Sequence, residues 1–327
     1  KAVDVKEFEK EAKRILKEVE EECGWMYETL HPLDDNDISV EDLYQPDLFK
    51  EAIYQQKINF DEKKYIKAKI NYTVWSDVFI CPDCVKELVF GEAAVDKDAG
   101  KVRDKFPCPH CHAELTKRKM ERAWTTKFDL ALKKSVKQAK QVPVLINYTI
   151  PGHKKRFEKI PDESDLALIE KIENSEIPYW FPTDRMMEGK ETRRNDPAGI
   201  THVHHFYTTR SLWILSALLK ESSEITDHVI SEFCRFLFQQ WAVGLSKLNR
   251  YSPTHFSQNN RNLSGTLYIG SQISEVSPHY AFTGKLKRLI KAFTNSKWHF
   301  FNISTQDTGH IRLKNDSVDY IFIDPPF

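Results

Sequence analysis

Hydrophobic residues recur at helical spacing at the start of the chain and give way to a strand-like pattern further on. After Asp4, a residue type that favours helix N-termini, apolar side chains share one face of an expected helix, Lys and Glu fill the other, and Gly24 marks its end. That apolar face consists of Val5, Phe8, Ala12, Ile15 and Val19. From Ile70 to Ile80, aromatic and β-branched residues predict a strand.

The remainder of the chain alternates between further helical and extended patterns. We expect strands at 142–150, 298–304 and 318–323, and helices at 162–173, 208–221, 225–248 and 282–293. Polar, glycine-containing stretches at 183–200 and 259–277 are typical of loops. Mixed helices and strands of this kind predict an α/β protein.

The charge is balanced over the whole chain but unevenly distributed along it. The 327 residues, 40% of them hydrophobic, suffice for two domains or for one domain with a large insertion, and the formal net charge is zero. Residues 1–60 contain 8 Lys or Arg against 16 Asp or Glu, whereas residues 101–160 contain 16 against 5. A local basic excess fits nucleic-acid contact, and it fits a solvated basic surface equally well.

No apolar run approaches the roughly 18 residues expected of a membrane helix, and the longest, 212–219, is interrupted by Ser216. We therefore expect no membrane association. Six cysteines, four of them in two Cys-x-x-Cys pairs, favour metal binding in a reducing compartment, so a cytoplasmic location is expected. The sequence begins at Lys1 and stops at Phe327, which belongs to its most informative motif. We therefore expect it to be a piece of a longer protein.

Two Cys-Pro-x-Cys pairs, with 23 residues between them, have the spacing of a zinc ribbon. The predicted ligands of a structural Zn²⁺ are Cys81, Cys84, Cys108 and Cys111. Each pair places two thiolates on one ion, and a hairpin with residues 91–100 at its tip accommodates the long spacing. Four thiolates close the site, so the metal is expected to be a scaffold, with His110 and His112 near the surface. Free structural cysteines and a redox pair are the alternatives.

A basic segment with interspersed aromatic residues follows the ribbon. Its basic residues are Lys117, Arg118, Lys119, Arg122, Lys127, Lys133, Lys134, Lys137 and Lys140, with Lys154, Lys155 and Arg156 beyond. Together with Trp124 and Phe128 they suit contact with a nucleic-acid backbone and stacking on bases.

Three histidines and one arginine further along are weaker candidates. His202, His204 and His205 would alternate sides on a strand with no carboxylate nearby, so we expect partly buried aromatic rings and no metal. Arg210 lies at the start of an expected helix. It could contact phosphate, cap the helix or form a salt bridge, and the sequence does not decide among these roles.

The last residues place a carboxylate at the end of an apolar strand. Residues 318–323 lead into Asp324-Pro325-Pro326-Phe327, and ligands of open α/β sheets bind beyond the carboxyl ends of strands. The prolines stiffen the bend and leave carbonyls free. Asp324 and the Pro325 carbonyl are suited to accept the two N–H bonds of a nucleobase amine, and Phe327 to stack on an extruded base.

Asp324-Pro325-Pro326-Phe327 resembles the Asp/Asn-Pro-Pro-Tyr/Phe motif of the S-adenosylmethionine-dependent amino methyltransferases of DNA, and the preceding QDTGHIRLKNDSVDYIFI is similar to the family's approach to its catalytic strand. The resemblance implies a Rossmann-like methyltransferase core, S-adenosylmethionine as cofactor, DNA as partner, catalysis by Asp324 to Phe327 and a cofactor contact by Asp307.

This resemblance also implies a division of the chain. Residues 1–32 would contribute a core helix, 33–160 an insertion with the zinc ribbon at about 72–118 and the basic segment, and 161–327 the core up to the catalytic strand. The chain lacks the family's glycine-rich cofactor turn, since residues 265–270 have the wrong context. The core is therefore expected to be incomplete, and this piece alone to be inactive.

The leading hypothesis is methylation of adenine N6, with cytosine N4 open because the motif does not separate the two. RNA base methyltransferases use related motifs, so RNA is an alternative partner. A non-catalytic zinc-ribbon protein that binds nucleic acid is the alternative from another class.

Overall fold

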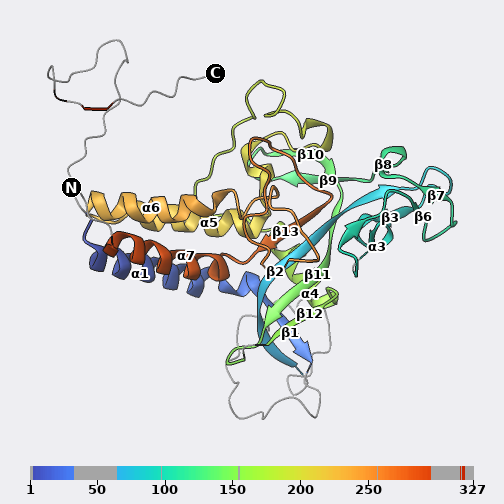
Figure 1. Ribbon diagram of the computed structural model, residues 1–327. Helices are drawn as coiled ribbons and strands as arrows, with labels where there is room; N and C mark the ends of the chain where they lie inside the picture. Colours follow the sequence, from blue (N-terminus) through green and yellow to red (C-terminus); the bar gives the residue numbers. More distant parts are fainter. Residues whose placement is uncertain are drawn as a thin grey trace.

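The computed structural model describes residues 3–32, 65–96, 98–153, 155–255 and 257–295, together with Ser317, Asp319 and Tyr320. Within these residues the protein is a mixed α/β molecule in which a layer of helices, a central sheet and a small ribbon subdomain follow one another (Figure 1). Every strand pairing among them is antiparallel.

The 16-residue strand β2 (Tyr65–Ile80) is the axis of the central sheet. It pairs along one edge with β11 (Gln141–Thr149), which in turn pairs with β12 (Arg156–Lys159). Along its other edge it pairs with β1 (Glu28–Pro32) and then β13 (Gln272–Val276). Its last residues pair with β3 (Glu87–Val89) and β8 (Glu121–Arg122), so one continuous strand joins the sheet to the ribbon.

The ribbon subdomain has a hydrophobic core of its own. It contains α3 (Phe90–Ala93), β4 (Val95–Asp96), β5 (Lys101–Val102), β6 (Phe106–Pro107), β7 (Glu114–Leu115) and the 3₁₀ turn η3 (Lys117–Lys119). Phe79, Leu88, Phe90, Phe106 and Leu115 pack together with the buried cysteines. Residues 91–100, predicted to form the loop at the tip of a hairpin, instead include most of α3 and all of β4, which pairs with β5. Gly100 in the turn between β4 and β5 is in the left-handed region (φ 63°).

Four helices pack side by side at the other end of the molecule (Figure 1). They are α1 (Val5–Cys23), α5 (Thr209–Ser223), α6 (His228–Ala242) and α7 (Pro278–Asn295). Asp4 caps α1 by accepting the backbone N–H of Lys6 and Glu7, as its sequence position predicts. The helix expected at 225–248 is shorter at both ends: it begins at His228, because Asp227 caps its N-terminus, and it ends at Ala242.

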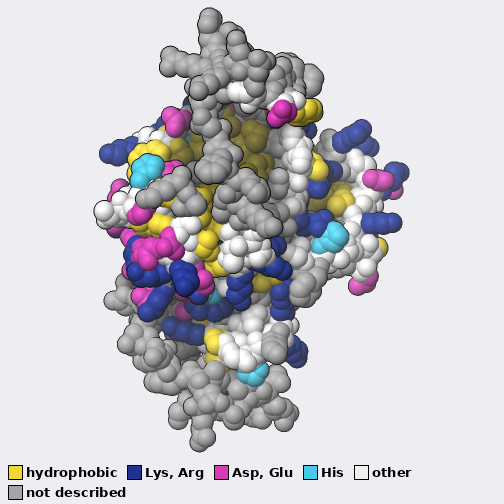
Figure 2. All heavy atoms as spheres, turned by 60° about the vertical axis from the view of Figure 1, so that its left-hand side comes forward, with side chains coloured by type: hydrophobic (Ala, Val, Ile, Leu, Met, Phe, Trp, Pro, Cys, Tyr) yellow, Lys and Arg dark blue, Asp and Glu magenta, His cyan; other side chains and the backbone are white. Residues whose placement is uncertain are grey.

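The helix-bearing side of the molecule exposes apolar side chains between charged ones (Figure 2). Among them lies a groove of about 530 Å³ between α1, α5 and α7, lined by Leu16, Val19, Leu218, Phe282 and Leu286 among others. In the part of the chain that is described, no helix is both long and apolar enough to cross a membrane.

The remaining elements connect sheet and helices. They are η1 (Gly24–Tyr27), β9 (Trp124–Asp129), β10 (Lys134–Ala139), α4 (Glu163–Glu173), η4 (Asp196–Ala198) and η5 (Val203–Phe206). The three histidines thus lie on a 3₁₀ turn and its N-cap, and the expectation of a strand there was wrong.

The mixed α/β class is confirmed, while the Rossmann-like core stays a prediction because only antiparallel strands are described. The central sheet combines strands from all three predicted segments, 1–32, 33–160 and 161–327.

Candidate metal centre and nucleic-acid interface

The four cysteines predicted to bind metal lie together at one end of the ribbon. Their sulfur atoms all fall within 4.8 Å of one another, with 3.8 Å between Cys81 and Cys111 and 3.9 Å between Cys84 and Cys108. Four sulfurs at 2.3 Å from a tetrahedral ion would be about 3.8 Å apart. The cluster therefore has the geometry to hold a metal ion such as zinc.

The two Cys-Pro-x-Cys turns have the same backbone conformation. In the first, Val85 N–H donates to the Cys81 carbonyl at 2.9 Å, and in the second His112 N–H donates to the Cys108 carbonyl at 3.0 Å. Val85 (φ 59°) and His112 (φ 62°) both occupy the left-handed region, which is unfavourable for residues with a side chain. Because both turns adopt this unfavourable geometry, we infer that each turn needs it to direct its two cysteine sulfurs toward the same point.

Local hydrogen bonds favour the thiolate form at one of the four cysteines, Cys108. Burial opposes ionisation of the Cys108 thiol, but hydrogen bonds from the backbone N–H groups of Cys111 and His110 and from the Cys111 and Cys81 thiols lower the pKa of Cys108 to about 6. Without a metal, the neighbouring sulfurs raise the pKa of Cys111 to about 12, so among these two cysteines the thiolate is favoured at Cys108. The His110 ring lies outside the cluster, with Nε2 2.9 Å from the Glu87 carbonyl oxygen, so His110 and His112 are not needed as ligands.

Much of the basic segment folds into a two-stranded hairpin, β9 and β10, of which β9 is mostly exposed and which packs against the turn at His204 and His205. Side chains alternate between its faces, so Trp124 and Phe128 share one face with Lys137. Phe128 is 60% exposed, and the Lys137 ammonium lies 4.8 Å from the centre of the Trp124 ring. Antiparallel ribbons of this size fit the grooves of a duplex, and exposed aromatic rings fit single-stranded bases.

A cavity of about 380 Å³ lies beneath this hairpin, between Phe128, Trp180 and the turn at His204. Lys247 and Glu173 also line it. Burial, and then the nearby Lys127, lowers the pKa of Lys247 to about 8. The basic hairpin and the aromatic, lysine-bearing cavity together form a continuous candidate surface for nucleic acid.

Asp129, at the end of β9, holds two of the three histidines. Its Oδ2 lies 2.9 Å from His204 Nε2 and 2.8 Å from His205 Nε2, and its Oδ1 accepts the backbone N–H of Ala131 and Leu132. The expectation that no carboxylate lies near these histidines was therefore wrong, because the partner is 75 residues away in sequence. Burial of His204 and His205 was predicted correctly.

The tautomer of His205 argues against a metal at this second cluster. The Thr201 backbone N–H donates to His205 Nδ1 at 3.2 Å, so in the neutral ring the proton is on Nε2 and is donated to Asp129. A metal on Nε2 would move that proton to Nδ1, where it would face the Thr201 N–H. The three residues do not fit a metal site, and they instead clamp the hairpin to the turn beneath it.

This clamp predicts a specific acid sensitivity. Burial, only partly offset by the Asp129 carboxylate, lowers the pKa of His205 to about 4. The unfolded chain binds the His205 proton more tightly than the folded chain does. The neutral, buried His205 therefore contributes its full stabilisation above about pH 6.5, and this contribution is lost as pH falls toward 4. We expect the free energy of unfolding in urea to be about 2 kcal/mol lower at pH 5 than at pH 7 on this account.

The His205→Gln variant isolates the titration of His205, because the cysteines and the other groups that do not contact His205 titrate alike in both proteins. The difference in unfolding free energy between the wild type and the variant should shrink as pH falls from 7 to 5. A difference that stays constant over this range would contradict a neutral, buried His205.

Arg210 forms a buried salt bridge, which decides among its predicted roles. Its Nε and Nη2 donate to the two carboxylate oxygens of Glu275 at 2.8 and 2.6 Å, and both residues are 3% exposed. Nη1 donates to the Met26 carbonyl and Nη2 also to Thr73 Oγ1. Arg210 therefore ties α5 to the sheet and cannot contact phosphate.

The predicted catalytic residues Asp324, Pro325, Pro326 and Phe327 lie outside the described residues, as does Asp307, so their roles stay predictions. Searches against protein-family models, curated proteins and solved structures find no match for this chain.

Proposed function

We propose that this chain is part of an S-adenosylmethionine-dependent methyltransferase that acts on an exocyclic amine of a DNA base, in the first place adenine N6. The observation that carries the proposal is Asp324-Pro325-Pro326-Phe327 at the end of an apolar segment. The amine nitrogen would bond to the methyl carbon as the carbon–sulfur bond breaks, S-adenosylhomocysteine would leave, and the nitrogen would release one proton. Asp324 and the Pro325 carbonyl would orient the amine, and Phe327 would stack on the base.

The described residues support the nucleic-acid half of this proposal. The cysteine cluster, with a structural Zn²⁺ as the proposed occupant, would hold the ribbon rigid at the end of β2. The adjoining hairpin of β9 and β10 exposes Lys133, Lys134 and Lys137, and the Lys137 ammonium lies over the Trp124 ring. The same features favour the alternative of a non-catalytic binding protein, and RNA in place of DNA, so the experiment has to separate these three.

The test is methyl transfer by the protein that contains this chain, with labelled S-adenosylmethionine and either duplex DNA or structured RNA as acceptor. We expect labelled N6-methyladenine in DNA. Asp324→Ala should lower the rate at least about 100-fold, the usual cost of losing a positioned acceptor. Asp324→Asn should retain more activity, because Asn keeps an oxygen acceptor in the same place.

Asp319→Ala is the matched control, because Asp319 is exposed and five residues from the motif. Its rate should equal that of the wild type. Transfer to RNA alone would replace the DNA assignment. If the protein binds nucleic acid in a salt-sensitive way but shows neither methyl transfer nor affinity for S-adenosylmethionine, the non-catalytic binding protein is the correct hypothesis.

The hairpin itself predicts a salt dependence. Lys133→Gln combined with Lys134→Gln should lower the slope of log affinity for duplex DNA against log salt concentration by about 1 to 2, because each lost phosphate contact removes roughly 0.9. Fluorescence anisotropy with a labelled duplex measures this slope. Lys10→Gln with Lys13→Gln removes the same charge from exposed positions on α1 and should leave the slope unchanged. Equal slopes for all three proteins would show that DNA does not bind at the hairpin.

A further inference from the structure

The cavity of about 380 Å³ beneath the hairpin is lined by side chains that carry unpaired, buried polar atoms. Gln138 and His204 both line it, and each is more than nine-tenths buried. Within the described part of the chain, Gln138 Nε2 and His204 Nδ1 have no hydrogen-bond partner. Buried polar atoms are normally paired, and the cavity has a volume usual for small-ligand sites, so these atoms indicate that a bound molecule belongs here.

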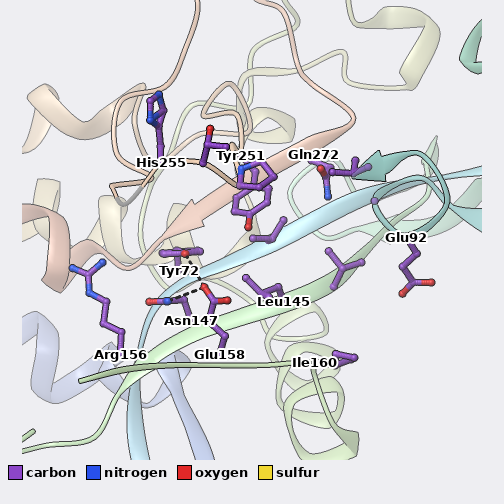
Figure 3. Close-up of a pocket in the computed structure, with 16 residues that line it drawn as sticks. Tyr72, Glu92, Leu145, Asn147, Arg156, Glu158, Ile160, Tyr251, His255 and Gln272 are labelled. Atoms are coloured by element: carbon purple, nitrogen blue, oxygen red, sulfur yellow. Dashed lines mark hydrogen bonds between the residues drawn. The ribbon is translucent and has the colours of Figure 1, made fainter. Parts of the chain in front are cut away.

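The larger cavity at the ribbon junction differs in this respect (Figure 3). It has a volume of about 690 Å³ and is lined by Tyr72 of β2 and Gly91 of the ribbon among others. Its Glu158 is exposed and accepts hydrogen bonds from Tyr72 and Asn147. Among the described residues, none of those with an unpaired, buried side-chain atom lines this cavity. The cavity beneath the hairpin is therefore the stronger candidate for a ligand site.

Lys247 also lines the cavity beneath the hairpin, and its ammonium makes no hydrogen bond or salt bridge with the described residues. Its backbone N–H donates to the Phe206 carbonyl at 2.7 Å, which fixes the start of the side chain. The side chain is only partly exposed, and burial, followed by the nearby Lys127, lowers its pKa to about 8. Lys247 and Gln138 line an adjoining cavity of about 30 Å³ as well, so they lie where the two cavities meet. The protein thus places a donor here without supplying its acceptor.

The acidic residues of the cavity determine which acceptor suits Lys247. Glu173 lines the cavity, and its carboxylate accepts from Lys127 at 3.3 Å and from Thr209 Oγ1 at 2.8 Å. Asp129 also lines it, and both of its oxygens accept hydrogen bonds. A phosphate inside the cavity would be repelled by these carboxylates, whereas a neutral carbonyl oxygen would not. The cavity therefore favours an uncharged ligand that offers acceptors.

Aromatic side chains make the cavity suitable for a flat ring. The aromatic residues that line it are Phe128, Tyr179, Trp180, Phe181 and Tyr207. Trp180 is 73% exposed and Phe128 is 60% exposed, so both rings are accessible to an entering base. Lys133 lines the cavity too, and its exposed side chain is available to a phosphate outside. Accessible rings beside an exposed lysine are typical of sites that bind single strands.

From this arrangement we infer that the cavity binds one unpaired guanine of a nucleic-acid strand. Guanine presents two adjacent acceptors, O6 and N7, to which a lysine ammonium donates, whereas adenine has an amine in place of O6. Lys247 makes this contact, the accessible rings stack on the base, and Lys133 binds a neighbouring phosphate. The inference rests on the nucleic-acid half of the proposed function and adds to it a site that reads one base.

Competition binding, followed by fluorescence anisotropy, tests the inference on the protein that contains this chain. The unlabelled DNA strands TTTGTTT, TTTITTT and TTTATTT, in which I is inosine, each displace a labelled TTTGTTT strand. The guanine and inosine strands share O6 and N7, so their affinities should agree within about threefold, and the adenine strand should bind at least about fivefold more weakly. This comparison uses the wild type alone and does not depend on the folding of a variant.

Three variants assign the preference to the cavity. Lys247→Met keeps the length of the side chain but removes the donor, so the guanine strand should fall to the affinity of the adenine strand, which should change less than about twofold. Trp180→Ala should weaken all three strands about tenfold and keep the preference, because stacking does not distinguish bases. Lys17→Met, at an exposed position on α1, is the matched control and should keep both affinity and preference.

The inference is overturned if no strand binds, if the wild type binds the adenine strand as tightly as the guanine strand, or if Lys247→Met, shown by circular dichroism to be folded, keeps the preference. Methyl transfer is measured separately, with duplex DNA and labelled S-adenosylmethionine. A guanine preference without methyl transfer supports this site and refutes the proposed enzyme. Methyl transfer without a guanine preference refutes this site alone.

Discussion

Replacing Cys108 by Ser is expected to abolish metal binding and to unfold the ribbon. The four sulfurs are spaced for one tetrahedral ion, and the ribbon surrounds them with only a small hydrophobic core. Structural zinc sites of this kind contribute about 10 to 16 kcal/mol in small peptides, far more than such a core supplies. The purified wild type should therefore contain one zinc per chain, and the variant none.

Hydrogen exchange locates the damage. Without the metal, the amides of residues 79–122 should lose protection, whereas those of α5 and α6, which pack in the separate helical core, should keep theirs. Chelation of the wild type should reproduce the variant. Cys234→Ser is the control, because Cys234 is buried in the helical core, so the zinc content should stay at one per chain even if that core loosens. A metal-free wild type, or a Cys108→Ser protein that retains zinc, would contradict the assignment.

The parts of this molecule that the sequence predicted well are those determined by neighbouring residues. The N-cap Asp4, the end of α1 near Gly24, the strand leading into Cys81 and the two cysteine turns all depend on interactions within a few positions. Cysteine turns in particular carry their ligand geometry in four consecutive residues, so pairing two of them required no knowledge of the sheet.

Interactions between distant residues could not be predicted in the same way. His204 and His205 looked like strand residues without a carboxylate because Asp129 reaches them only after β9 folds over their turn. The cavity at the ribbon junction takes Tyr72, Glu158 and Gln272 from three strands of the antiparallel sheet, and no local pattern marks any of them. The resemblance to a methyltransferase also gave no hint of these antiparallel pairings, because it rests on a motif beyond the described strands.

The other large effect is expected at Arg210, where the salt bridge with Glu275 is inside the protein. Arg210→Ala would leave the Glu275 carboxylate buried with only neutral donors, from Trp75, Thr208, Tyr27 and Ser211, among the described residues. Breaking such a pair typically costs about 3 to 5 kcal/mol. Urea unfolding at pH 7 measures this loss. Arg210→Lys should lose less, because it keeps the charge while giving up the two-pronged contact.

Two comparisons make the cause of this loss specific. Arg14→Ala removes an arginine whose side chain is 38% exposed and whose carboxylate partners, Glu11, Glu18 and Glu221, all remain partly exposed, so it should cost under about 1 kcal/mol. In Arg210→Ala, the uncompensated burial should raise the pKa of Glu275 above its value in the unfolded chain, so the folded state takes up a proton more readily as pH falls. The stability deficit relative to the wild type should therefore be smaller at pH 5 than at pH 7. A deficit below 1 kcal/mol at pH 7 would mean that Arg210 does not hold α5 to the sheet.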